Sequence, residues 1–140
     1  MRVAITGSNG LIGSELVSSL ASDGVTVVKV VRHQPAGPDE VQWDPEAGTV
    51  AAGAFDNVDA VVHLAGEGIA DHRWTTTQKQ RIVDSRIGGT AAIAAACANA
   101  SNGPRTLISG SAVGFYGAPG NVEVDETSPA GDDFLARLCV

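Results

Sequence analysis

A glycine-rich turn near the N-terminus is the feature that most constrains the fold of this chain. Glycine stands at positions 7, 10 and 13, between an apolar run at residues 2–5 and a segment of helical periodicity at residues 11–21. Residues without a Cβ let the backbone turn sharply, and the first turn of a helix offers unpaired N–H groups at the positive end of its dipole. A strand, a glycine turn and a helix in this order predict a site for the pyrophosphate of a dinucleotide.

The rest of the chain repeats this alternation of short strands and helices. Residues 25–31, 60–64 and 106–109 are rich in β-branched and apolar side chains, which is typical of strands buried on both faces. Helical segments separate these runs, so the strands should be parallel. Residues 41–50 have turn formers between β formers and predict a small hairpin. We therefore predict an α/β fold with a Rossmann-type doubly wound parallel sheet.

The longest predicted helix covers residues 75–100. Thr75 followed by Gln78 resembles a capping box, and the later part of the segment is rich in alanine. Gly88 and Gly89 interrupt it at a cost of about 1 kcal/mol each relative to alanine. We expect close packing on the sheet or on a cofactor to offset that cost.

The end of the second predicted strand indicates which dinucleotide would bind. Sites selective for NAD place a carboxylate about 20 residues after the glycine turn, whereas an arginine accommodates the 2′-phosphate of NADP. Arg32 follows Gly13 by 19 residues, and no carboxylate occupies that strand end. A guanidinium pairs permanently with phosphate, so the sequence favours NADP(H) over NAD(H). The alternative is that Arg32 is a solvated loop residue.

Composition excludes several other classes of protein. The chain has 140 residues, 9 basic against 16 acidic, and a net charge of −7 without any basic stripe, which argues against a nucleic-acid partner. No apolar run approaches the about 18 residues of a membrane span. Cys97 and Cys139 lack metal-ligand spacing, so we expect no metal site and a reducing, cytoplasmic location. The length fits one domain, residues 1–140.

Several segments together resemble the extended short-chain dehydrogenase/reductases. They are residues 6–13, 64–66, 85–90 and 109–117. Residues 41–45, 64–70, 73–74 and 133–136 resemble, more narrowly, the atypical branch labelled nucleoside-diphosphate-sugar epimerases. The resemblance spans the whole chain and implies an NAD(P)-binding Rossmann domain.

The resemblance also implies roles for individual residues. The backbone of the glycine turn would hold the pyrophosphate, Arg32 the 2′-phosphate, and Ala65 and Gly66 would line the cofactor. The turn comprises Gly7, Ser8, Asn9, Gly10, Leu11, Ile12 and Gly13. Ser111 matches the serine that orients the substrate oxygen beside the nicotinamide, although a hydroxyl at a strand end also commonly bonds to backbone.

The catalytic tyrosine and lysine of the family are missing. Phe134 stands where the tyrosine would be and Leu138 where the lysine would be, and neither can transfer a proton. Tyr116 is the single tyrosine and is a candidate acid, with packing or substrate stacking as the alternative. A polar loop at residues 67–73 is a weaker candidate. His63, inside an apolar strand, is expected to be a satisfied core residue.

Two functions are compatible with these observations. One is an NADP(H)-binding oxidoreductase or epimerase-like protein that acts on an unknown small molecule, and the other is a dinucleotide-binding module without turnover. Complete family members continue with another strand and a C-terminal substrate domain, so we expect this chain to be the N-terminal part of such a protein. Without that further strand and the substrate domain, the chain would expose apolar surface, which favours a homo-oligomer.

Overall fold

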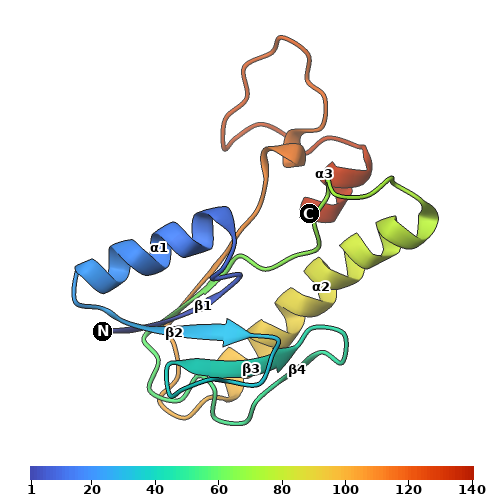
Figure 1. Cartoon of the computed structure of the whole chain (residues 1–140). Helices are drawn as coiled ribbons and strands as arrows, with labels where there is room; N and C mark the ends of the chain where they lie inside the picture. The colour runs from blue at the N-terminus through green and yellow to red at the C-terminus, as the bar shows by residue number, and fades with distance from the viewer. The chain divides into compact units, whose positions relative to one another are not determined.

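A computed structural model describes all 140 residues and divides them into two compact units, Met1–Ser109 and Gly110–Val140. The first unit contains six strands and two α-helices (Figure 1). In chain order they are β1 (Arg2–Thr6), α1 (Leu11–Ser22), β2 (Thr26–Val31), β3 (Glu40–Asp44), β4 (Thr49–Val50), β5 (Ala60–His63), α2 (Thr76–Asn99) and β6 (Thr106–Ser109). This order confirms the predicted α/β alternation.

The six strands form one sheet in the order β4-β3-β2-β1-β5-β6. All neighbours are parallel except β3 and β4, which form the predicted hairpin. The chain moves outward from β1 through β2 to β3, and then returns to the other side of β1 for β5 and β6. Strand order therefore reverses at β1, and the crevice between β1 and β5 is where open α/β sheets bind ligands.

One helix covers each face of the sheet. Helix α1 packs on β1 and β2, whereas α2 packs on β4, β5 and β6 (Figure 1). The core beneath α2 joins strand residues to Ile93 of the helix, and its buried members include Ala4, Val28, Trp43, Phe55 and Val61. No helix has the length and hydrophobicity needed to span a bilayer.

The two glycines inside α2 differ in their surroundings. A Cβ at Gly89 would stand 3.6 Å from the Trp43 ring, which confirms the expected close packing of the helix on the sheet. A Cβ at Gly88 would meet nothing within 4 Å, so that expectation is wrong for Gly88.

Only half of the predicted capping box forms at the start of α2. The Thr75 hydroxyl accepts a hydrogen bond from the Gln78 backbone N–H at 3.2 Å. The Thr75 N–H donates to the Arg73 carbonyl at 2.8 Å and not to the Gln78 side chain, whose amide donates to Glu67 Oε1 at 3.1 Å. The helix thereby fixes the loop that precedes it.

The expectation that residues 106–109 form a buried strand is wrong. They do form β6, parallel to β5, but all four residues are exposed, with Leu107 at 37% and Ile108 at 54%. β6 is the edge strand of the sheet, with a neighbour on one side only, and its side chains are left uncovered.

The second unit consists of a short 3₁₀ helix, η1 (Val113–Tyr116), and helix α3 (Phe134–Cys139). The Asp133 carboxylate caps α3 by accepting the Ala136 N–H at 2.9 Å, as expected for a helix that begins near residue 132. Helix α3 packs on η1, and a Cβ at Gly114 would stand 3.3 Å from Leu135 Cβ.

Candidate dinucleotide-binding site

The turn between β1 and α1 is built so tightly that two of its residues must be glycine. Gly7 has φ +67°, and a Cβ there would stand 2.9 Å from the carbonyl carbon of Leu64 and 3.0 Å from the nitrogen of Ala65. A Cβ at Gly13 would stand 2.1 Å from the Gly7 carbonyl oxygen. The start of α1, the turn and the end of β5 are therefore in direct backbone contact.

Gly10 is the N-cap of α1, and no side chain caps the helix there. The Gly10 N–H donates to the Gly7 carbonyl at 3.0 Å and so closes the turn. The N–H groups of the first helical residues have no partner within the helix and lie at the positive end of its dipole. The side chains of Leu11 and Ile12 are 92% and 69% exposed, so the backbone is the part of this turn suited to bind an anion.

A buried hydroxyl connects β1 to the end of β5. Thr6 Oγ1 accepts hydrogen bonds from the N–H groups of Leu64 at 3.0 Å and Ala65 at 3.1 Å. It also lies 2.7 Å from His63 Nδ1. Burial lowers the pKa of His63, which favours the neutral imidazole. The expectation of a satisfied core histidine is met at Nδ1, whereas Nε2 is buried without a hydrogen-bond partner.

Helix α2 holds the loop after β5 through hydrogen bonds to the N–H, the carbonyl and the carboxylate of Glu67. The Ser85 hydroxyl accepts the Glu67 N–H at 3.0 Å, and Arg86 Nη1 donates to the Glu67 carbonyl at 3.0 Å. The Gln78 amide also donates to the Glu67 carboxylate at 3.1 Å, so Glu67 anchors the loop to α2. The rest of the polar loop, residues 71–73, is exposed.

The guanidinium of Arg86 also explains Gly66. A Cβ at Gly66 would stand 3.3 to 3.5 Å from three atoms of that guanidinium. The sequence predicted Gln78 only as part of a capping box and predicted no contact of Gln78 or Ser85 with Glu67. The available signal was their spacing of seven residues, which places both on one face of a helix.

Arg32 follows directly on Val31, the last residue of β2, and its side chain is exposed. Because β2 lies parallel beside β1, Arg32 leaves the sheet at the same edge as the glycine turn. It makes no ion pair. The carboxylate of Glu40 at the start of β3 has other partners, since it lies 3.3 Å from His33 Nε2 and accepts the Ala36 N–H at 2.8 Å.

Ser111 and Tyr116 belong to the second unit, Gly110–Val140. Ser111 is exposed. Tyr116 is half-buried in η1, and its ring meets that of Phe115 edge to face with centroids 5.2 Å apart. Phe134 begins α3, and Leu138 follows one turn later.

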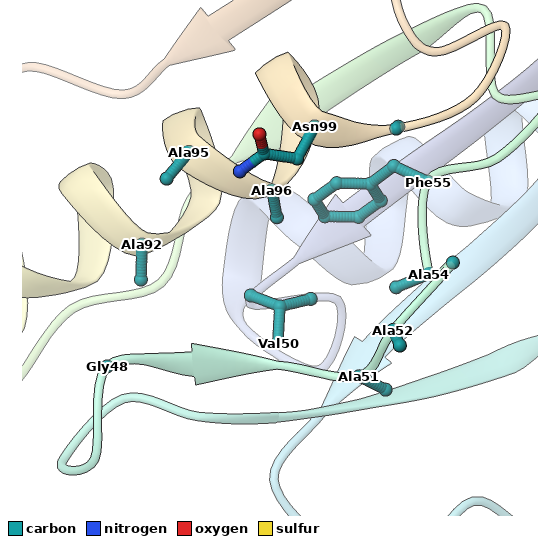
Figure 2. A pocket seen from close by; sticks show the side chains of 12 residues that line it. Gly48, Val50, Ala51, Ala52, Ala54, Phe55, Ala92, Ala95, Ala96 and Asn99 are labelled. Carbon is teal, nitrogen blue, oxygen red and sulfur yellow. The ribbon is translucent and has the colours of Figure 1, made fainter.

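A cavity of about 260 Å³ lies elsewhere in the first unit, between the residues that follow β4 and the second half of α2 (Figure 2). Its lining is alanine, glycine, Val50, Phe55 and Asn99, with no titratable group. None of the candidate site residues lines it. No three His, Cys, Asp or Glu side chains converge on a metal-binding position.

Residues 3–133 match the NAD dependent epimerase/dehydratase family. The chain belongs to this family. An epimerase family protein of Mycobacterium bovis is 49% identical over 138 residues, which cover 99% of this chain and 45% of the relative. The chain thus spans less than half the length of this curated relative.

Two solved structures bear on the cofactor. The human epimerase family protein SDR39U1, crystallised with NADPH, superposes with a TM-score of 0.85 at 36% identity and covers 99% of this chain and 46% of its own. MoeE5, in complex with UDP-glucose and NAD, superposes with a TM-score of 0.79 at 25% identity. The match covers 99% of this chain and 45% of the MoeE5 chain. The family and these neighbours support dinucleotide binding, and they leave the choice between NADP and NAD open.

Proposed function

We propose that this chain is the cofactor-binding part of an NADP(H)-dependent oxidoreductase or epimerase-like enzyme that acts on a small molecule. The observation that carries the proposal is the glycine turn at the uncapped start of α1, with Arg32 at the neighbouring strand end. A Cβ at Gly7 or Gly13 would fill the space that this turn needs. The arrangement fits a pyrophosphate on the backbone of residues 7–13 and a 2′-phosphate on Arg32.

Ala65 and Gly66 would line the nucleotide in this proposal, because the peptide between residues 64 and 65 lies against Gly7. When bound, the nicotinamide would supply or accept a hydride. In this proposal, the residues of this chain bind the cofactor, orient it and move a proton at the substrate oxygen.

The choice of NADP(H) is tested by replacing Arg32. We expect the unmodified chain to bind NADPH more tightly than NADH, and Arg32→Ala to lose about 1 to 3 kcal/mol of binding free energy toward NADPH alone. The measurement is calorimetric titration with both cofactors. Arg105→Ala is the matched control, because Arg105 is also exposed but precedes β6, at the opposite edge of the parallel sheet. Equal affinity of the unmodified chain for the two cofactors would contradict the assignment.

Proton transfer is tested at the second unit. Neither Phe134 nor Leu138 can exchange a proton, so we propose Tyr116 as the acid and Ser111 as the group that orients the substrate oxygen. Tyr116→Phe keeps the ring and removes only the hydroxyl. It should lower the rate by about 10²- to 10⁴-fold. Ser111→Ala tests the orienting hydroxyl in the same way.

The assay is NADPH oxidation over a panel of sugar nucleotides, quinones and small aldehydes, in this chain and in any longer polypeptide that contains it. The NADPH affinity of each variant is measured first, so that a binding defect is not mistaken for a chemical one. Full activity of both variants would remove Ser111 and Tyr116 from the mechanism.

A further inference from the structure

Thr6 and His63 are buried neighbours at the carboxyl ends of β1 and β5, where they face each other in the sheet register. Thr6 Oγ1 lies 2.7 Å from His63 Nδ1, 3.0 Å from the Leu64 nitrogen and 3.1 Å from the Ala65 nitrogen. One hydroxyl group therefore connects β1 to three polar groups at the end of β5.

The bonding capacity of a hydroxyl fixes the direction of each bond. A hydroxyl has one hydrogen to donate and two lone pairs to accept. The N–H groups of Leu64 and Ala65 can only donate, so they occupy both lone pairs. The hydroxyl hydrogen is left for His63 Nδ1, which must then be unprotonated. A neutral imidazole in this position carries its proton on Nε2.

The surroundings of the imidazole favour its neutral form, and Nε2, which carries the proton in this tautomer, is buried without a hydrogen-bond partner. Its contacts are the Thr6 hydroxyl and the Trp43 ring, which crosses it at 89° with centroids 5.9 Å apart, and neither group is charged. Burial lowers the pKa of His63 and so favours the neutral ring. A proton on Nδ1 would need a lone pair of the hydroxyl, and one of the two backbone N–H groups would lose its acceptor.

We infer that His63 is a positioning residue for the cofactor, because its unprotonated Nδ1 orients the Thr6 hydroxyl that holds the Leu64–Ala65 backbone against Gly7. The inference rests on the proposed function, in which Gly7 and Ala65 lie at the dinucleotide. The coupling is steric. A Cβ at Gly7 would stand 2.9 to 3.0 Å from backbone atoms of residues 64 and 65, so this segment lies directly against the turn and a shift of it toward Gly7 would move the turn.

Four substitutions separate hydrogen bonding from packing. Thr6→Val keeps the shape and removes the hydroxyl, whereas Thr6→Ser keeps the hydroxyl. His63→Leu removes the acceptor, whereas His63→Asn places an amide oxygen close to the position of Nδ1. We expect NADPH to bind about tenfold more weakly to Thr6→Val and His63→Leu, and within about threefold of the unmodified chain to Thr6→Ser and His63→Asn.

Ile93→Ala controls for a general loss of stability. Ile93 is fully buried in the core under α2 and forms no part of the hydrogen-bond network. It should lower the unfolding temperature without changing the NADPH dissociation constant. Affinities are compared well below the unfolding temperature of every variant.

Nitrogen-15 spectra of the imidazole give a readout that does not depend on NADPH. We expect the spectrum of a neutral ring with an unprotonated Nδ1 and a protonated Nε2 in the unmodified chain. A proton on Nδ1 at neutral pH would overturn the inference, and so would a Thr6→Val variant that binds NADPH like the unmodified chain. If the unmodified chain itself binds no NADPH, the proposed function fails and the cofactor role of His63 fails with it, whatever the tautomer.

Discussion

Individual glycines of this chain differ in what a side chain would meet. At Gly13 a Cβ would collide with the Gly7 carbonyl oxygen at 2.1 Å, whereas at Gly88 it would meet nothing within 4 Å. Both residues lie inside helices, Gly13 in α1 and Gly88 in α2. A comparison of alanine substitutions at these two positions therefore separates the cost of a steric clash from the ordinary helix propensity of alanine.

We expect Gly88→Ala to stabilise the chain by about 1 kcal/mol, and Gly13→Ala to destabilise it by several times that amount. The reason is that α1 must move away from the turn to admit a methyl group at Gly13, while the same group at Gly88 points into open space. Chemical denaturation of both variants measures the two free energies of unfolding. A Gly13→Ala variant as stable as the unmodified chain would show that α1 does not approach the turn as closely as described.

At the scale of elements, β6 is the strand whose surroundings are least complete. It is an edge strand without lysine or proline, and Leu107 and Ile108 are exposed. Unpaired N–H and C=O groups beside apolar side chains favour pairing with another chain. Relatives of this chain are about twice as long, so their further residues have the opportunity to cover this edge.

We expect the 140-residue chain to associate in solution through β6, in a manner that increases with concentration. Ile108→Lys should shift it toward the monomer, because a charge on an edge strand opposes pairing. Val122→Lys is the control, since Val122 is 68% exposed but lies outside the sheet. Sedimentation velocity over a range of concentrations measures the effect. A monomeric chain at all concentrations would contradict this account of the edge.

The elements themselves could be predicted from sequence because their signals are local. The β-branched runs and the periodicity of residues 11–21 indicated β1, β2, β5 and α1, and Thr75 correctly indicated the start of α2. Burial was harder, because the exposure of Ile108 depends on whether β6 has a second neighbour. A sequence pattern shows what a strand is suited for, but not whether a neighbouring strand is present.

The candidate site shows the same division between local and long-range signals. Gly7, Gly13 and Arg32 could be proposed from spacing, because the glycine turn is a contiguous motif. The pairing of Thr6 with His63 joins residues 57 apart in sequence. The bonds from Ser85 and Arg86 to Glu67 likewise depend on how α2 packs. No local pattern carries that information.

At the scale of the whole molecule, we expect a dinucleotide to bind at the carboxyl edge of the sheet. The first unit offers two places for a ligand. One is the glycine turn at the point where strand order reverses, and the other is the apolar cavity of Figure 2. Only the turn offers unpaired helix N–H groups and a neighbouring arginine, so phosphate chemistry favours it.

Titration of the nitrogen-15-labelled chain with NADPH, followed by amide spectra, tests this claim most directly. We predict large shifts at Gly7, at residues 11–13 and at Ala65, a smaller effect at Arg32, and unchanged amides at residues 51–55 around the cavity. NADPH that leaves the glycine turn unperturbed, or that shifts the amides around the cavity instead, would contradict it.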